Sequence, residues 1–281
     1  MDCVLVCFSI DRTATKLASY RLYVSAKDTT VRLWSRTTFE LAHIFTGHTG
    51  PVNAIDLSRT SKRIISASGD GTLVLWDIQS RRLLRTFSGH SRGLACVAFV
   101  GSASSSGGIQ ETCGSLDDEL VVSGSNDKTI RIWHASSGEC LCLLEGHENL
   151  VRALAYDALT GRLVSASYDQ SVIVWELQRS SAEPVPCTAD ELSTACGRRE
   201  GEGRKQIVTA TKSREFKGLH SSHIFDVKFD LTRIVRFVTL YKSLRVHANS
   251  ESIVLRSSSH DRKVVVLDFG FDIDSSIFIP N

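Results

Sequence analysis

Three sets of serine, histidine and aspartate recur along the chain, and each set contains the side chains of a nucleophilic triad. In such a triad the histidine accepts the serine proton and the carboxylate orients the imidazole. Hydrolysis needs one site, so three sets at a regular interval are better explained by a structural unit that repeats. We therefore predict that the chain is not an enzyme. The sets are Ser66, His48 and Asp70; Ser123, His90 and Asp127; and Ser165, His147 and Asp169.

A tryptophan and a Gly-His pair define the interval. Gly47 and Gly146 each precede a tryptophan by 29 positions, and Trp34, Trp76 and Trp133 each precede the glycine of the next Gly-His pair by 13. The period is therefore 42 residues, and a constant period of this size is typical of solenoids and propellers. The repeat signatures end at residues 34, 76, 133, 175 and, in a weaker copy, 267.

Each repeat contains short β-branched and apolar segments bounded by turn residues. Residues 129–133 (TIRIW) and 172–175 (VIVW) are typical of strands, and residues 51–57 (PVNAIDL) and 83–87 (LLRTF) predict two more in each repeat. About four strands without helical periodicity are the composition of one propeller blade. A single blade cannot bury both faces of its sheet, so we expect the blades to stack.

The order of these markers resembles the WD-repeat signature: a Gly-His pair, an aspartate turn, and then Trp76-Asp77, with Trp133-His134 as a variant. The resemblance implies an all-β fold, a WD-repeat β-propeller of four-stranded antiparallel blades. About five repeats are recognisable, in a single domain over residues 1–281. Because seven blades are usual in this family, we expect a truncated or interrupted propeller.

The same resemblance implies a hydrogen-bond network of histidine, serine, aspartate and tryptophan inside each blade. A buried imidazole must satisfy both ring nitrogens, and a serine hydroxyl can connect it to an indole N–H. The predicted network residues are His48, Ser66, Asp70, Trp76, His90, Ser123, Asp127, Trp133, His147, Ser165, Asp169 and Trp175.

Three stretches exceed the period. Residues 101–118 are rich in Gly and Ser and predict a loop inside a blade, and residues 178–211 are polar and predict a disordered surface excursion. Removing residues 236–256 joins Arg233–Val235 to Ser257–Asp261 in the register of the fourth repeat. This insertion therefore falls inside a predicted strand, where loops are rarely tolerated. We hypothesise that it is foreign to the fold, for example a translated intron.

The resemblance also implies a partner-binding face. WD-repeat proteins commonly bind partners through the residue before the turn aspartate and the first residues of the innermost strand. Arg152 and Tyr168 are the strongest candidates, because Arg and Tyr often anchor interfaces, although each could be an ordinary exposed side chain. The candidates are Asn53, Asn126, Arg152, Tyr168, Phe225 and His260, with Gly69 at the equivalent position of an earlier repeat.

Composition limits the classes of partner. Lys and Arg number 33 against 31 Asp and Glu, so we expect neither nucleic acid nor an anionic membrane as partner. No segment has the pattern of a signal peptide or a membrane span, which predicts a soluble protein of the cytoplasm or nucleus. The eight cysteines form no CxxC pair, and the aspartate turns lack the ligand spacing of a calcium loop. We predict no metal, disulfide framework or cofactor.

Three stretches are similar to a narrower group, the F-box/WD-repeat proteins. They are GHENLVRALAYD, HIFDVKFDLTRIV and SSSHDRKVVVLDFG. That resemblance implies the substrate-recognition propeller of a ubiquitin-ligase receptor, which holds a protein or peptide that is often phosphorylated. Contact with the ligase adaptor would need an F-box upstream, because repeat material begins almost at Met1. The alternative is a general WD-repeat scaffold for signalling, transcription or RNA-processing complexes.

Overall fold

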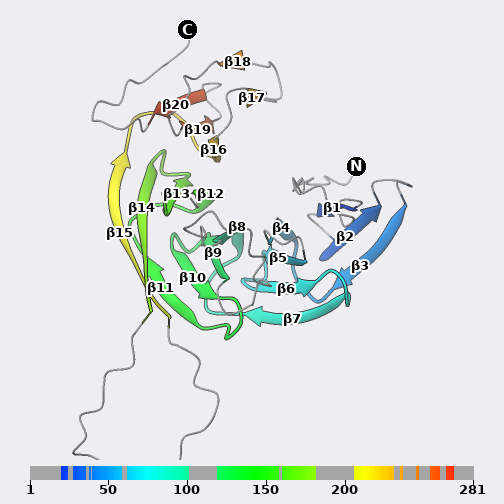
Figure 1. Ribbon diagram of the computed structural model, residues 1–281. Helices are drawn as coiled ribbons and strands as arrows, with labels where there is room; N and C mark the ends of the chain where they lie inside the picture. The colour runs from blue at the N-terminus through cyan, green and yellow to red at the C-terminus, as the bar shows by residue number, and fades with distance from the viewer. Residues whose placement is uncertain are drawn as a thin grey trace, which may run out of the picture.

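The fold is built from small antiparallel sheets, and every regular element in the described part of the chain is a β-strand. The structure is a computed structural model, and the sheets follow one another along an arc (Figure 1). It describes residues 20–24, 28–35, 38, 40–58, 62–100, 119–157, 160–181, 206–230, 235–236, 245–246, 254–259 and 264–268.

Three complete sheets of four strands occupy the middle of the arc. In each sheet the strands are hydrogen-bonded in chain order, so every connection joins antiparallel neighbours. This arrangement confirms the predicted all-β fold of four-stranded blades. The sheets comprise β4 (Val52–Leu57), β5 (Arg63–Ser68), β6 (Leu73–Asp77) and β7 (Arg82–Phe87); β8 (Leu94–Val100), β9 (Leu120–Ser125), β10 (Ile130–His134) and β11 (Cys140–Leu144); and β12 (Val151–Asp157), β13 (Arg162–Ser167), β14 (Val172–Ser181) and β15 (Gln206–Phe216).

The two ends of the arc carry three-stranded sheets. The N-terminal sheet has the order β1-β2-β3 and the C-terminal sheet the order β16-β19-β20, with β17 and β18 forming a separate pair. Trp34 and Leu267, which end the first and last repeat signatures, lie on β2 and β20. The bounds are β1 (Tyr20–Val24), β2 (Thr30–Ser35), β3 (Leu41–Thr46), β16 (Ile224–Asp230), β17 (Val235–Arg236), β18 (Arg245–Val246), β19 (Val254–Ser259) and β20 (Val264–Asp268).

The core lies between the sheets, so the central strands bury both of their faces. On β6, Val74 and Trp76 pack toward the N-terminal sheet, whereas Leu73 and Leu75 pack toward the β8–β11 sheet. Successive side chains of a strand point to opposite faces, which explains why the run LVLW is apolar at every position. Burial of each such side chain stabilises the fold by about 1.5–3 kcal/mol.

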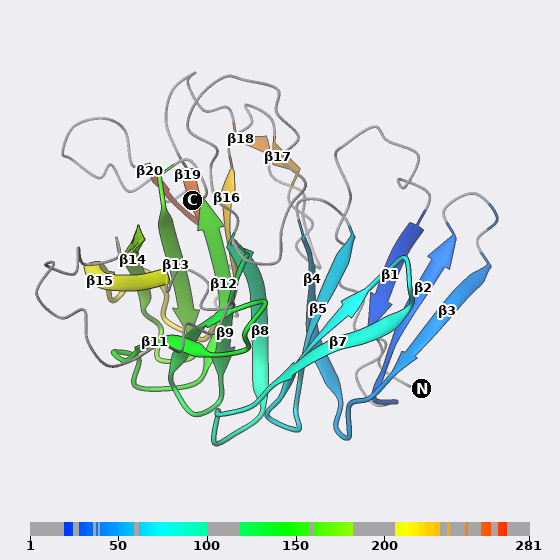
Figure 2. The same ribbon diagram turned by 60° about the horizontal axis from the view of Figure 1, so that its bottom comes forward.

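Side chains also join neighbouring sheets near the inner edge of the arc, where β4 and β8 lie side by side (Figure 2). The carboxylate of Asp56 on β4 accepts the N–H of Phe99 on β8 at 2.8 Å. Arg63 forms an ion pair of 2.7 Å with Glu119 of the next sheet. These contacts fix the relative position of the two sheets beyond what apolar packing alone specifies.

The three predicted insertions have different outcomes. Residues 101–118 lie outside the described residues. The boundaries 178–211 are too wide, because β14 and β15 remain paired as far as Ser181 and Gln206. The insertion therefore extends a hairpin rather than interrupting the sheet.

The placement of residues 236–256 inside a strand is wrong. Val254 and Leu255 belong to β19 and pair with Asp230 and Phe229 of β16. In the preceding complete sheet, Arg162 pairs with Asp157 at the same register position as Val254. The extra residues therefore precede the strand, in the connection from β16 to β19. Insertions are tolerated in connections, so the reason for regarding the segment as foreign to the fold no longer holds.

Candidate protein-binding face

A buried network of side-chain hydrogen bonds lies at one end of each complete sheet. In the β4–β7 sheet, His48 contacts Ser66 Oγ through Nε2 at 2.8 Å and Asp70 Oδ2 through Nδ1 at 3.1 Å. The indole Nε1–H of Trp76 donates to the same serine oxygen at 2.9 Å. A hydrogen-bonded chain therefore runs from the indole through serine and imidazole to the carboxylate.

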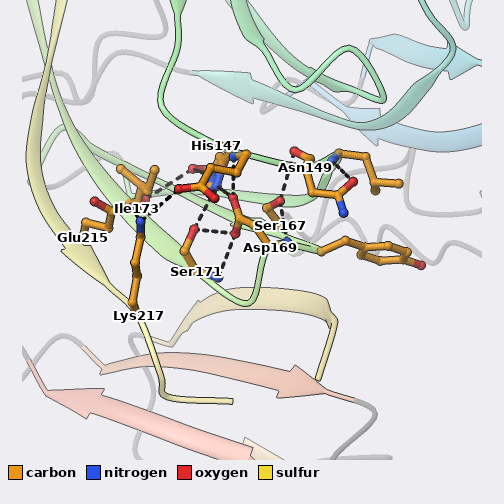
Figure 3. Close-up of polar contacts among 12 residues, drawn as sticks. His147, Asn149, Ser167, Asp169, Ser171, Ile173, Glu215 and Lys217 are labelled. Atoms are coloured by element: carbon orange, nitrogen blue, oxygen red, sulfur yellow. Dashed lines mark hydrogen bonds and ion pairs between the residues drawn. The ribbon is translucent and has the colours of Figure 1, made fainter. Parts of the chain in front are cut away.

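The same series of hydrogen bonds recurs in the next two sheets with nearly the same geometry. His90 lies 2.8 Å from both Ser123 Oγ and Asp127 Oδ2. His147 lies 2.8 Å from Ser165 Oγ and 3.0 Å from Asp169 Oδ2, as Figure 3 shows for its aspartate. Trp133 and Trp175 donate to their serines at 2.8 Å and 2.9 Å.

Each turn aspartate also holds the loop that carries its histidine. Asp169 accepts the N–H of Glu148 at 2.8 Å, one residue after His147, and the N–H and hydroxyl of Ser171 (Figure 3). One carboxylate therefore binds the loop and the turn together. A charged carboxylate is a strong acceptor for several N–H groups.

The electrostatics follow from this bonding. Burial alone raises the pKa of Asp127, but hydrogen bonds from Thr129 and His90 outweigh it and lower that pKa to about 2. The pKa values of Asp70 and Asp169 are lowered by equivalent hydrogen bonds that also outweigh burial. Burial lowers the pKa of His90, against the opposing effect of Asp127. A neutral imidazole beside a carboxylate is the state that this bonding favours at neutral pH.

The three serines cannot act as nucleophiles in this arrangement. Ser66, Ser123 and Ser165 are each 0% exposed, and each oxygen accepts an indole N–H. A nucleophile must reach its substrate, and a fully buried, hydrogen-bonded hydroxyl does not. These sets therefore serve the frame and not a reaction.

The adjacent loops and turns form a face whose positions vary between sheets. The innermost strands β4, β8, β12 and β16 each show a register break near their start. The unpaired residue at each break is Asn53, Ala95, Arg152 or Phe225. A β-bulge redirects the side chain that it carries, so these four positions share one orientation relative to their sheets.

Two of the predicted partner-binding residues are partly committed to neighbouring sheets. Asn53 donates through Nδ2 to the carbonyl of Leu94 at 2.7 Å, and Arg152 donates through Nη1 to the carbonyl of Ala95 at 3.2 Å. Both acceptors lie on β8. Asn53 and Arg152 therefore join the innermost strands of neighbouring sheets as well as lying at the face.

Two other candidates are brought together by the fold. Tyr168 and Phe225 come from adjacent sheets, and their rings lie 5.5 Å apart in an edge-on arrangement. His223, which the sequence pattern did not single out, stacks on Tyr168 at 4.5 Å and contacts the Tyr168 carbonyl through Nδ1 at 2.8 Å. Asn126 is exposed at the position equivalent to Tyr168, and His260 lies outside the described residues.

The repeat geometry agrees with a comparison with known families. The family model described as WD domain, G-beta repeat matches residues 39–77, 81–134 and 138–176. Each match contains one complete histidine, serine, aspartate and tryptophan network. The chain is a WD-repeat protein. Each sequence repeat spans the outermost strand of one sheet and three strands of the next, which ties consecutive sheets together covalently.

Relatives of this WD-repeat protein cover it to different extents. Nuclear distribution protein PAC1-2 of Uncinocarpus reesii is 34% identical over 171 residues, 58% of this chain and 37% of the relative. GID complex subunit 7 of Schizosaccharomyces pombe is 31% identical over 166 residues, 59% of this chain and 30% of the relative. An uncharacterized WD repeat-containing protein of S. pombe is 29% identical over 274 residues, 91% of this chain and 64% of the relative. The chain thus spans less than two thirds of each relative.

Two kinds of residue at equivalent positions in several sheets escaped the sequence analysis. His220 is 2% exposed and precedes Ile224 by four positions, as His147 precedes Val151. The spacing to the innermost strand identifies it, although Leu219 replaces the usual glycine. The second kind is the hydroxyl two positions after each turn aspartate, which bonds both that aspartate and the histidine: Thr72, Thr129 and Ser171.

Neither a metal site nor a membrane helix occurs in the described residues. No cluster of three or more His, Cys, Asp or Glu side chains in them could hold a metal ion. No helix there is long and apolar enough to cross a membrane.

Proposed function

We propose that this WD-repeat protein is a non-catalytic scaffold that binds another protein on the face carrying Asn126, Arg152, Tyr168 and Phe225. The observation that carries the proposal is the aromatic cluster of Tyr168, His223 and Phe225, held on a rigid frame by the buried networks. Aromatic side chains and Arg dominate interface energies, especially when they are held in place before binding.

The position of Arg152 supports the same face. Its guanidinium reaches the Ala95 carbonyl, so part of its conformational entropy is already lost in the unbound protein. Restricting a long side chain in advance lowers the cost of binding. The protein surface around Arg152 therefore favours recognition of a partner over a purely solvated role.

More specifically, the chain is the substrate-recognition propeller of an F-box/WD-repeat type of ubiquitin-ligase receptor, acting in the cytoplasm or nucleus. This rests on the similarity of residues 146–157, 223–235 and 257–270 to that group. The substrate would be a protein or peptide, and contact with a ligase adaptor would need an F-box upstream of Met1. A scaffold for signalling, transcription or RNA-processing complexes is the alternative if no F-box is encoded there.

Photocrosslinking tests the binding face. A photoreactive amino acid at Asn126 in the full chain, expressed in its source cells, should yield crosslinked adducts that Tyr168→Ala reduces. The same amino acid at Lys62, an exposed residue in the β4–β5 connection at the opposite end of the sheet, is the matched control. Equal adducts from both positions would contradict the proposal. A full-length read of the transcript upstream of Met1 separates the receptor from the general scaffold.

A further inference from the structure

A serine in the connection from β7 to β8 lies one residue from the guanidinium of an arginine in the next sheet. Ser88 is exposed and directly precedes Gly89. A Cβ on Gly89 would lie 3.1 Å from Nη1 of Arg131, which belongs to β10. Consecutive Cα atoms are about 3.8 Å apart, and Gly89 has no side chain that would separate Ser88 from this guanidinium.

The guanidinium of Arg131 lacks an anionic partner. In the described part of the chain it forms no ion pair, and its Nη1 has only the weak acceptor Sγ of Cys140, at 3.9 Å. Arg32 also stands two positions before a repeat tryptophan, and the Nε atoms of both arginines are buried without a hydrogen-bond partner. However, Arg32 donates through Nη2 to the carboxylate of Asp28. Arg131 therefore has donors available for an anion, and buried donors without acceptors are rare.

The turn aspartate of the same sheet does not take this role. Asp127 is the counterpart of Asp28, but its Oδ2 contacts His90 and its Oδ1 accepts the N–H and hydroxyl of Thr129. Among the described residues Asp127 and Arg131 form no ion pair. The loop histidine thus occupies the carboxylate that the arginine binds in the N-terminal sheet.

The next sheet carries an acid at the position equivalent to Ser88. Glu145 is exposed and directly precedes Gly146, and a Cβ on Gly146 would lie 3.7 Å from Nζ of Lys212. A cation therefore lies beside the glycine in both loops. The residue before the glycine is an acid in one loop and a serine in the other, so a phosphate on the serine would give both loops the same pattern of charge.

The ionised turn aspartates do not exclude an anion at this position. The register of β7 against β6 equals that of β11 against β10. Ser88 therefore has the same position relative to Asp70 as Glu145 has relative to Asp127. Because the fold accommodates the charge of Glu145 beside an ionised aspartate, it can accommodate a charge on Ser88 as well.

The segment before Ser88 has features of a protein-kinase substrate. β7 is the last strand of its sheet, so its outer edge is unpaired within the described residues. Leu83 and Arg85 stand five and three positions before Ser88. Leu83 is 45% exposed although it is apolar, and Arg85 is partly exposed. An extended segment with an apolar and a cationic anchor suits a kinase groove that offers an apolar pocket and an acidic side chain.

We infer that Ser88 is a phosphorylation site and that its phosphate binds the guanidinium of Arg131. This inference goes beyond the proposed function and does not depend on it. A protein kinase supplies the phosphoryl group from ATP. Ser88 Oγ bonds to the γ-phosphorus, the bond from that phosphorus to ADP breaks, and the hydroxyl proton passes to the catalytic base of the kinase.

The phosphate changes the connection between two sheets. It adds nearly two negative charges and three strong acceptor oxygens, and a guanidinium can bind such oxygens in pairs. The new ion pair ties the connection from β7 to β8 to strand β10. Phosphorylation should therefore stabilise the joint between the β4–β7 and β8–β11 sheets.

Phosphoserine inserted at position 88 of the full chain through an expanded genetic code tests the ion pair. In a urea titration the ratio of folded to unfolded protein should rise about tenfold over that of the unmodified chain. Arg131→Gln should abolish this gain, measured as the difference between the modified and unmodified forms of the variant. In a phosphorus NMR titration the second pKa of the phosphate, ordinarily about 6, should be lowered by the guanidinium.

Thr46 provides the matched control position. It is exposed and precedes Gly47 as Ser88 precedes Gly89, but the atoms nearest a Cβ on Gly47 belong to Trp76 and Leu83 rather than to a cation. Phosphoserine in place of Thr46 should give no gain in stability. Equal gains at the two positions, or a gain at position 88 that survives Arg131→Gln, would overturn the assignment of Arg131 as the partner of the phosphate.

Mass spectrometry of the protein isolated from its source cells tests whether the modification occurs. A phosphopeptide with the phosphate on Ser88 is the expected result. Recovery of this peptide only in its unmodified form, from growing and from stressed cells alike, would overturn the assignment of Ser88 as a phosphorylation site.

Discussion

The buried network and the exposed face of this protein lie a few residues apart and follow opposite rules. Asp127 belongs to a network that has the same residue types in three sheets, whereas Asn126, its neighbour in the chain, is Gly69 in one sheet and Tyr168 in another. Identity across repeats marks positions that every sheet needs for stability. Variation at equivalent positions marks places where the frame imposes no residue, and these are free to serve recognition.

Acid should have the largest effect on the stability that the buried networks provide. The folded pKa of Asp127 is about 2, below its ordinary value of 3.8, and those of Asp70 and Asp169 are lowered as well. A carboxylate with a lowered folded pKa stabilises the fold above its unfolded pKa, and this contribution is lost as pH falls through the folded value. Urea unfolding at a series of pH values should therefore show stability falling steeply below pH 4.

The pKa of Asp56 is shifted in the opposite direction. Burial raises its pKa to about 6, although hydrogen bonds from Phe99 and Leu57 oppose the shift. Its stabilising contribution is present below pH 3.8 and is lost as pH rises through 6. The stability curve should thus have its maximum between about pH 4 and pH 6, and Asp56→Ala should remove the decline on the alkaline side. A curve that stays flat down to pH 2 would contradict the role assigned to the turn aspartates.

Removing one imidazole should have the next largest effect. His48→Ala deletes two hydrogen bonds, to Ser66 and Asp70, and the contact of the imidazole with the Trp76 ring. Ser66 and Asp70 keep other partners, so the loss comes from the two deleted bonds, about 1 kcal/mol each, and from the cavity left in a buried site. The free energy of unfolding should drop by about 2–4 kcal/mol. Denaturant titration measures this change. A loss below about 0.5 kcal/mol would place His48 outside the structural network.

Removing only the indole donor should cost less. Trp76→Phe keeps an aromatic ring in the core but loses the Nε1–H that donates to Ser66. Ser66 keeps its contact with His48, so we expect destabilisation of about 1–2 kcal/mol from the lost hydrogen bond and the smaller ring. Denaturant titration measures this destabilisation. A loss as large as that of His48→Ala would contradict the prediction that the imidazole contributes more to stability than the indole N–H.

The smallest effect should come from the variable face. Asn126→Ala changes an exposed side chain and should alter the free energy of unfolding by less than about 0.5 kcal/mol. Asp127→Ala, one residue later in the same turn, is the matched comparison and should destabilise the protein clearly. Equal effects of the two changes would remove the distinction between network and face.

The sequence predicted the repeated parts well because periodicity reports positions that every sheet needs. The twelve network residues recur at constant spacing, the WD-repeat resemblance implies the bonds between them, and in all three complete sheets each histidine lies 2.8 Å from its serine oxygen. His220 was missed because Leu219 replaces the glycine used as the marker. The partners of Asn53 and Arg152 could not be predicted, since they are main-chain carbonyls about 40 to 60 residues away in the chain.

The insertion before β19 shows where the repeat period alone fails to place a strand. Residues 233–235 and 254–256 both suit a strand, and the sequence pattern chose the first segment. Pairing with β16 selects the second, because it continues directly into Ser257–Ser259 and needs no break in the strand. Continuity of hydrogen bonding along a strand therefore outweighs local similarity.

The most direct test compares Tyr168→Ala with Ser165→Ala, three residues apart in the same sheet. It measures the yield of crosslinked adducts from a photoreactive amino acid at Asn126 in each folded variant, together with its free energy of unfolding. We predict that Ser165→Ala lowers stability and leaves the adduct yield of the folded fraction unchanged, because Ser165 is fully buried. Tyr168→Ala should weaken binding at nearly constant stability. Loss of binding with Ser165→Ala, or full binding with Tyr168→Ala, would contradict the division between frame and binding face.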